Sequence, residues 1–176
     1  MKRTLVMILA VCLVLCGCAS QGGGGRQIRQ EVISAYDMDS EMQEQVEKLF
    51  ADCDQAFKEL EEIKAPMSTD VYNYAKTISD LLSDFYDAFN WETVKEKMNN
   101  ASSEEEKSSF ATVLLESNDV IRCKSGLNMQ LFNMMMGMGS GESCLEAAVE
   151  AINGYAQFFY GEAHITEEDL DRIGVK

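Results

Sequence analysis

Four stretches of the chain place apolar residues at spacings of three and four, which is the pattern of an amphipathic helix. The first stretch runs from about residue 40 to residue 64 and carries this spacing at Val46, Phe50, Cys53, Phe57 and Leu60. Asp39 or Ser40 can cap its start, and Pro66 lies just beyond its end. The pattern therefore predicts one long helix between these boundaries.

The second stretch begins at Ser68 or Thr69 and reaches about residue 90, and the segment 91–98 either extends it or forms a separate turn. The third begins at Ser102 or Ser103, each of which has a glutamate three residues later, as in a capping box. We expect it to weaken at Ser125-Gly126. The fourth runs from near residue 142 to Gly161, where a helix-ending glycine belongs, and residues 166–172 add a last short turn.

These elements predict an all-α fold. An antiparallel four-helix bundle is the first expectation, and a looser set of helical hairpins is the alternative. We assign residues 39–176 to a single helical domain, because about 140 residues suit one domain.

The N-terminus follows a different pattern. Lys2 and Arg3 precede an uncharged run over 4–15, which suits a signal peptide and is too short to span a bilayer. The sequence Leu15-Cys16-Gly17-Cys18 then resembles the bacterial lipobox, in which small residues precede the cysteine that receives lipid such as palmitate. The resemblance implies that the signal peptide 1–17 is removed and that Cys18 anchors the exported chain to a membrane.

The residues after Cys18 predict a tether and a location. We assign 18–38 to the lipidated cysteine and a flexible linker, because the four glycines at 22–25 cannot hold regular structure cheaply. No aspartate follows Cys18, and this pattern resembles outer-membrane sorting. We therefore expect a cell-envelope protein, facing the periplasm from the outer membrane if the host has two membranes.

The charge of the mature chain limits its partners. Loss of Lys2 and Arg3 leaves 13 of 15 basic residues against 30 acidic ones, a net charge of 13 − 30 = −17. Such a chain is not expected to bind nucleic acid, where neutralised phosphates supply much of the affinity. It can accept a basic partner, although most of these charges are expected to solvate helix faces.

Three cysteines keep free thiols in the predicted mature chain: Cys53, Cys123 and Cys144. In an up-down-up-down bundle whose third helix ends near Gly126, Cys123 and Cys144 share one end. We therefore predict a Cys123–Cys144 disulfide in an oxidising compartment. Cys53 lies on the apolar stripe of its helix and is expected to be a buried thiol.

Five of the methionines crowd into ten residues of one segment, which also holds Phe132. One interpretation is a short helix that packs on the bundle end. A second is an adaptable surface that binds a partner. A third is a soft-metal site for Cu(I), formed by thioether sulfurs. The candidate residues for partner binding are Met129, Phe132, Met134, Met135, Met136 and Met138.

Motifs for catalysis are absent from the sequence. No zinc-type Cys/His spacing and no phosphate-binding glycine loop occurs, and no cofactor or metal is assigned. His164 follows the fourth helix and is expected to face solvent. We therefore expect a non-enzyme that docks a protein partner at the membrane, with a ligand- or Cu(I)-binding lipoprotein as the alternative. This general form is similar in architecture to the pilotin-type chaperones of secretion systems, which grip a partner helix in a groove.

Overall fold

The fold was taken from a computed structural model, which describes residues 26–89 and 91–174. The predicted signal peptide, Cys18 and the four glycines lie outside these residues. The described chain is all helical, and its helices pack into a bundle, as the sequence predicts. They are α2 (Gln30–Tyr36), α3 (Ser40–Glu62), α4 (Ser68–Ala88), α5 (Trp91–Asn100), α6 (Glu104–Met135), α7 (Gly141–Tyr160) and α8 (Glu167–Arg172).

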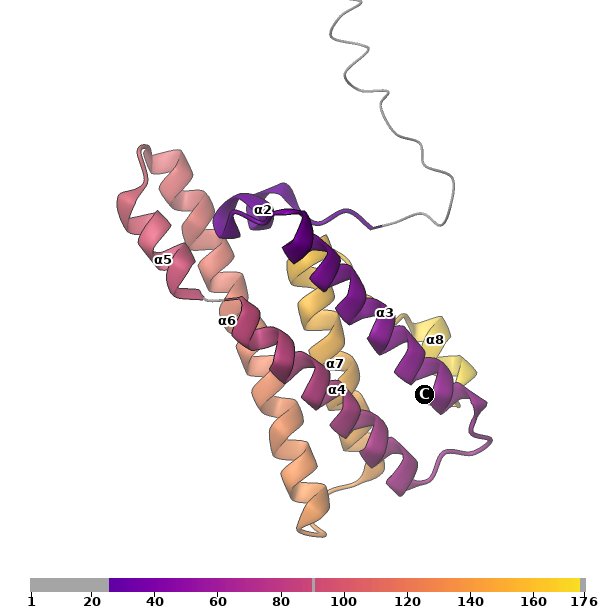
Figure 1. Ribbon diagram of the computed structural model, residues 1–176. Coiled ribbons are helices and arrows are strands. Elements are labelled where there is room, and N and C mark those ends of the chain that lie inside the picture. Colours follow the sequence, from indigo (N-terminus) through magenta and orange to yellow (C-terminus); the bar gives the residue numbers. More distant parts are fainter. Residues whose placement is uncertain (1–25, 90, 175–176) are drawn as a thin grey trace, which may run out of the picture.

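The four long helices alternate in direction. Figure 1 shows α3 running down, α4 up, α6 down and α7 up, so that chain neighbours are antiparallel. Helix α7 packs against both α4 and α6, and its buried residues face the centre of the bundle. We call the end that holds the α3–α4 and α6–α7 connections the distal end, because residue 26 enters at the opposite end.

The helix boundaries follow local capping chemistry. Asp39 accepts a hydrogen bond from the Met42 backbone N–H at 2.9 Å, and Ser103 accepts one from Glu106 at 3.1 Å. These bonds satisfy backbone donors that the first helical turn leaves free. Gly161 has a φ of 77°, a left-handed conformation that ends α7 at the predicted position.

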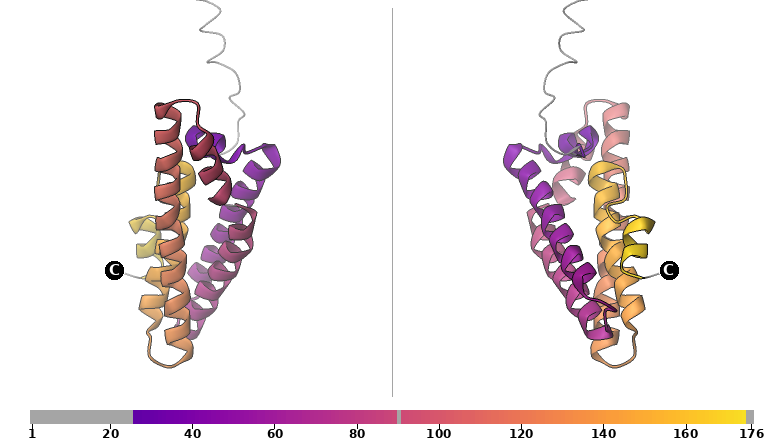
Figure 2. Two further views of the ribbon diagram at one scale, coloured as in Figure 1. Left: turned by 90° about the vertical axis from the view of Figure 1, so that its left-hand side faces the viewer. Right: turned by 90° about the vertical axis from the view of Figure 1, so that its right-hand side faces the viewer.

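The two hairpins spread apart toward the end where residue 26 enters, as the side views in Figure 2 show. Helices α2 and α5 lie between them there, and α2 packs against α5 and α6. The ring of Tyr36 in α2 makes edge contacts with Phe89, Trp91 and Phe158, with centroids 5.4–6.4 Å apart. This aromatic cluster fills the wider end of the bundle.

Helix α2 corrects the predicted tether. The sequence assigned residues 18–38 to a flexible linker, but α2 buries Val32, Ala35 and Tyr36. Arg29 holds the preceding segment on the bundle, because its backbone N–H bonds to the Phe159 carbonyl at 2.7 Å. Its guanidinium also pairs with Glu116 at 2.9 Å. The packed part of the chain therefore begins near residue 26.

Candidate functional site

The distal end carries an exposed apolar surface. Five large side chains there are 52–69 % exposed, and we call them the distal patch: Met129, Phe132, Met135, Met136 and Met138. Among the described residues, three other large apolar side chains are also exposed. Ile63 and Met67 lie in or beside the α3–α4 connection at the same end. Leu115 lies 20 residues before the end of α6, or about 30 Å at 1.5 Å per residue.

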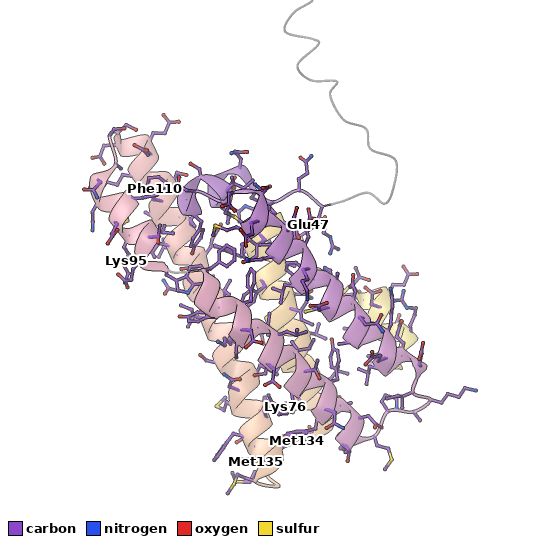
Figure 3. All side chains as sticks on the ribbon, in the orientation of Figure 1. Glu47, Lys76, Lys95, Phe110, Met134 and Met135 are labelled. Atoms are coloured by element: carbon purple, nitrogen blue, oxygen red, sulfur yellow. The ribbon has the colours of Figure 1, made fainter. Side chains whose placement is uncertain are left out.

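The helical periodicity of α6 determines which residues form the patch. Leu127 is fully buried, and Leu131 and Met134 pack partly against the core. Residues at 129, 132 and 136 fall on the opposite side of the helix because their spacing of three and four keeps them on one face. The segment thus forms the last turns of α6 and the connection after it, rather than a short separate helix across the bundle end. Figure 3 shows Met134 and Met135 at this tip.

Two hollows adjoin the patch. Met134 and Met135 line one of about 320 Å³ together with Ser68, Thr69 and Tyr72 of α4. A larger groove of about 910 Å³ begins at Ser68 and runs past the α3–α4 connection to the first turn of α7 and the end of α8. Gly141 permits this close meeting of helix ends, since a Cβ there would lie 3.1 Å from the Ser68 Cα. The distal end therefore offers a depression beside exposed thioether and phenyl groups.

The predicted disulfide is wrong. Cys123 and Cys144 are both free thiols, because α6 continues through Gly126 instead of ending there. Cys123 lies beside Glu150 and Gly154 of α7, with its Sγ 3.9 Å from a Glu150 carboxylate oxygen. These positions are six to ten residues beyond Cys144, or about 9–15 Å along the helix. A disulfide requires Cα atoms within about 7 Å.

The thiols are poorly suited to nucleophilic chemistry. Burial raises the pKa of Cys53 to about 12, with a further contribution from the neighbouring Asp54 and Asp52 carboxylates. Burial also raises the pKa of Cys123 and that of Cys144. Thiolates are the reactive form, so these residues lack the lowered pKa of a catalytic cysteine. Cys53 is buried, in agreement with the expectation from its place on the apolar stripe.

The side chain of His164 is largely covered instead of facing solvent, since 7 % of it is exposed. Its ring lies against Phe50, and its Nε2 bonds to Asp54 at 2.7 Å. The Arg26 guanidinium lies against Nδ1 of the same ring. His164 thus joins α3, the C-terminal segment and the start of the described chain in a structural role. No sequence signal pointed to this contact, because the three elements are far apart in the chain.

The distal patch does not have the ligands of a hard-metal site. Among the described residues, no group of three His, Cys, Asp or Glu side chains is placed to hold a metal ion. Within the same residues, no helix has the length and apolar character needed to cross a membrane. The arrangement can offer soft sulfur atoms and apolar contact area, and both suit binding more than catalysis.

The fold defines the class of the protein as an all-α helical bundle with an exposed apolar end. No family model, curated protein or solved structure matches the chain. The function must therefore be inferred from the surface itself.

Proposed function

We propose that this is a lipid-anchored docking protein of the cell envelope, held to a membrane through Cys18 and binding a protein partner at its distal end. The observation that carries the proposal is the gathering of exposed apolar side chains there, with Leu115 the single exception away from that end among the described residues. A contiguous exposed apolar surface is costly in water and commonly marks an interaction site. Methionine suits such a surface, because its flexible side chain adapts to the partner.

The surroundings of the patch support a protein partner. Its stretch of chain holds no charged residue between Lys124 and Glu142, although a quarter of the whole chain is charged. A partner that covers this surface therefore buries no ion from residues 125–141, and burial of unpaired ions is what weakens interfaces most. The adjoining hollow, lined by Tyr72, Met134 and Met135, can receive an apolar anchor of a helical partner.

Site-specific crosslinking tests the docking site. A photoreactive amino acid at residue 136 should give one dominant adduct in cells of the host, whereas the same group at residue 115 should give none. Leu115 is the matched control, because it is an exposed apolar residue of α6, the helix that Met136 caps. Identical adducts from both positions, or none from either, would refute a docking site at the distal end.

Lipidation has its own test. A labelled palmitate analogue should be incorporated into the wild-type protein, and Cys18→Ser should abolish labelling and release the protein from membranes. Labelling that persists in the Cys18→Ser variant would refute the anchor without bearing on the distal patch.

The alternative, a Cu(I) site, uses the sulfur atoms of Met134, Met135, Met136 and Met138. Replacing all four by leucine keeps their apolar volume and removes the thioethers. Docking predicts that the crosslinked adduct survives this change. Loss of the adduct together with loss of bound Cu(I) would favour the metal site.

A further inference from the structure

A second groove lies between α7 and α8, away from the Met-rich tip. Leu145 and Val149 of α7 and Leu170 of α8 supply its apolar lining, and its volume is about 240 Å³. This is space for an inserted side chain rather than for a whole small molecule, since ligand pockets usually exceed about 300 Å³. Glu146 and Glu150 complete the lining, so carboxylates stand at the edge of an apolar hollow.

The charges around this groove share one sign. Helix α7 contains no lysine or arginine, and its exposed glutamates at 142, 146 and 150 follow one another about 6 Å apart. Among the described residues, none of the three forms a salt bridge. Like charges four residues apart destabilise a helix, so this row is unfavourable in the free protein.

Helix α8 contributes Leu170 to the lining of the groove and carries acidic residues nearby in its sequence. Glu167 lies one turn before Leu170 and Asp171 directly follows it, on the side of the helix away from Asp169. Arg172, the basic residue of α8, is held by Glu61 at 2.5 Å and Asp169 at 2.7 Å. The residues that line the groove therefore give it an apolar floor with two carboxylates of α7 at its edge, and none of these lining residues is cationic.

These features limit the occupant. A single metal ion does not fit, because no group of three potential ligands among the described residues is placed to hold one. A membrane surface or a nucleic acid carries the wrong charge. The remaining match is a cationic amphipathic helix whose charges are spaced like those of α7 and whose apolar side chain fills the hollow.

We infer that the α7–α8 groove binds a basic amphipathic segment of a partner protein. One apolar side chain of that segment enters between Leu145, Val149 and Leu170, and its lysine or arginine side chains pair with Glu146 and Glu150. The groove meets the larger distal groove at Leu145, which lines both, so one partner can occupy the two surfaces together. The inference itself does not depend on the distal patch.

The test uses the mature chain from residue 18, with Cys18→Ser, and a fluorescent synthetic helix of leucine and lysine as the probe. Two variants each remove two glutamate charges: Glu146→Gln with Glu150→Gln, and Glu104→Gln with Glu105→Gln. The second pair is the matched control, because it lies in the exposed first turn of α6 at the other end of the bundle. Circular dichroism verifies that both variants keep their helix content.

We expect the probe to bind the parent chain, and the Glu146/Glu150 variant to bind it about three- to tenfold more weakly. The control variant should change affinity less than twofold, and Leu170→Asp should abolish binding. Equal weakening by the two double variants would reveal non-specific attraction and overturn the inference, as would absence of probe binding. Neither result affects crosslinking at residue 136, so this inference and the proposed distal docking site can fail separately.

Discussion

Two glycines on neighbouring helices should respond in opposite ways to the same substitution. A glycine inside a helix costs about 0.8–1.0 kcal/mol relative to alanine. At Gly126 in α6 an added Cβ meets no atom within 4 Å, so Gly126→Ala should recover nearly all of that energy. At Gly154 in α7 an added Cβ would lie 3.2 Å from the Cys123 Sγ and 3.4 Å from its Cβ. Overpacking of this kind costs about 1–3 kcal/mol, so Gly154→Ala should be destabilising by about 0–2 kcal/mol.

Urea denaturation followed by circular dichroism at 222 nm measures both changes. Gly126→Ala should raise the free energy of unfolding by about 0.8 kcal/mol. In a double-mutant cycle, Cys123→Ala should remove the penalty at Gly154, since the crowding sulfur is gone. If Gly154→Ala stabilised the protein as much as Gly126→Ala, Cys123 could not lie against Gly154. The register of α6 on α7 would then be wrong.

Three further predictions concern the core, the thiols and pH. Leu127→Ala should destabilise the fold by about 2–4 kcal/mol in thermal or urea unfolding, because Leu127 is fully buried. Leu115→Ala, at an exposed position, should change stability by under about 0.5 kcal/mol. Equal effects would contradict the orientation of α6. In the native protein at pH 8, a thiol reagent should modify half-buried Cys123 first and leave Cys53 unmodified until unfolding, as mass spectrometry of timed samples would show; rapid labelling of Cys53 would contradict its burial. Burial alone would raise the pKa of Asp169, but hydrogen bonds from Thr166 and the Arg172 ion pair outweigh it and lower the pKa. Ionised Asp169 therefore stabilises the fold above its ordinary pKa, and this stabilisation is lost as the pH falls through the lowered value. Asp169→Asn should accordingly reduce the free energy of unfolding more at pH 7 than at pH 3, and equal reductions would refute the ion-pair argument.

The long helices were predictable because their apolar spacing and capping residues act locally. Asp39 caps α3, Ser103 caps α6 and Gly161 ends α7, each at a position that the sequence indicated. The capping box at Thr166 likewise starts the short helix α8. Side-chain bonds to nearby backbone groups depend on a few neighbouring residues, so sequence alone reveals them.

The continuation of α6 was not predictable in the same way. Ser125 and Gly126 have low helix propensity, yet Val120 and Leu127 on either side of them are buried against the bundle. Tertiary packing of an apolar face outweighs a local cost of about 1 kcal/mol. The predicted disulfide failed for this reason, because it depended on an early end of the third helix.

A short helix and contacts between residues far apart in the chain were also not predicted from the sequence. Helix α2 is seven residues long, too short to show a helical repeat, and it is held by Arg29 and by aromatic packing around Tyr36. The burial of His164 depends on Arg26 and Asp54, which are 138 and 110 residues away in the chain. For the candidate site, the sequence composition identified the methionines, but only the helical geometry of α6 shows which of them are exposed.

The described chain enters at one end of α7, and the distal patch lies at the other. This arrangement affects how strongly the patch must bind a partner. Helix α7 spans 20 residues, or about 30 Å. If Cys18 holds the lipid, the patch stays close to the membrane, and one molecule within about 30–50 Å of it corresponds to an effective concentration of roughly 10 mM. Toward a partner that is already held within that distance, an intrinsic dissociation constant as weak as about 100 μM would give nearly full occupancy. A few exposed methionines can therefore suffice at the membrane even when the same contact is undetectable between molecules free in dilute solution.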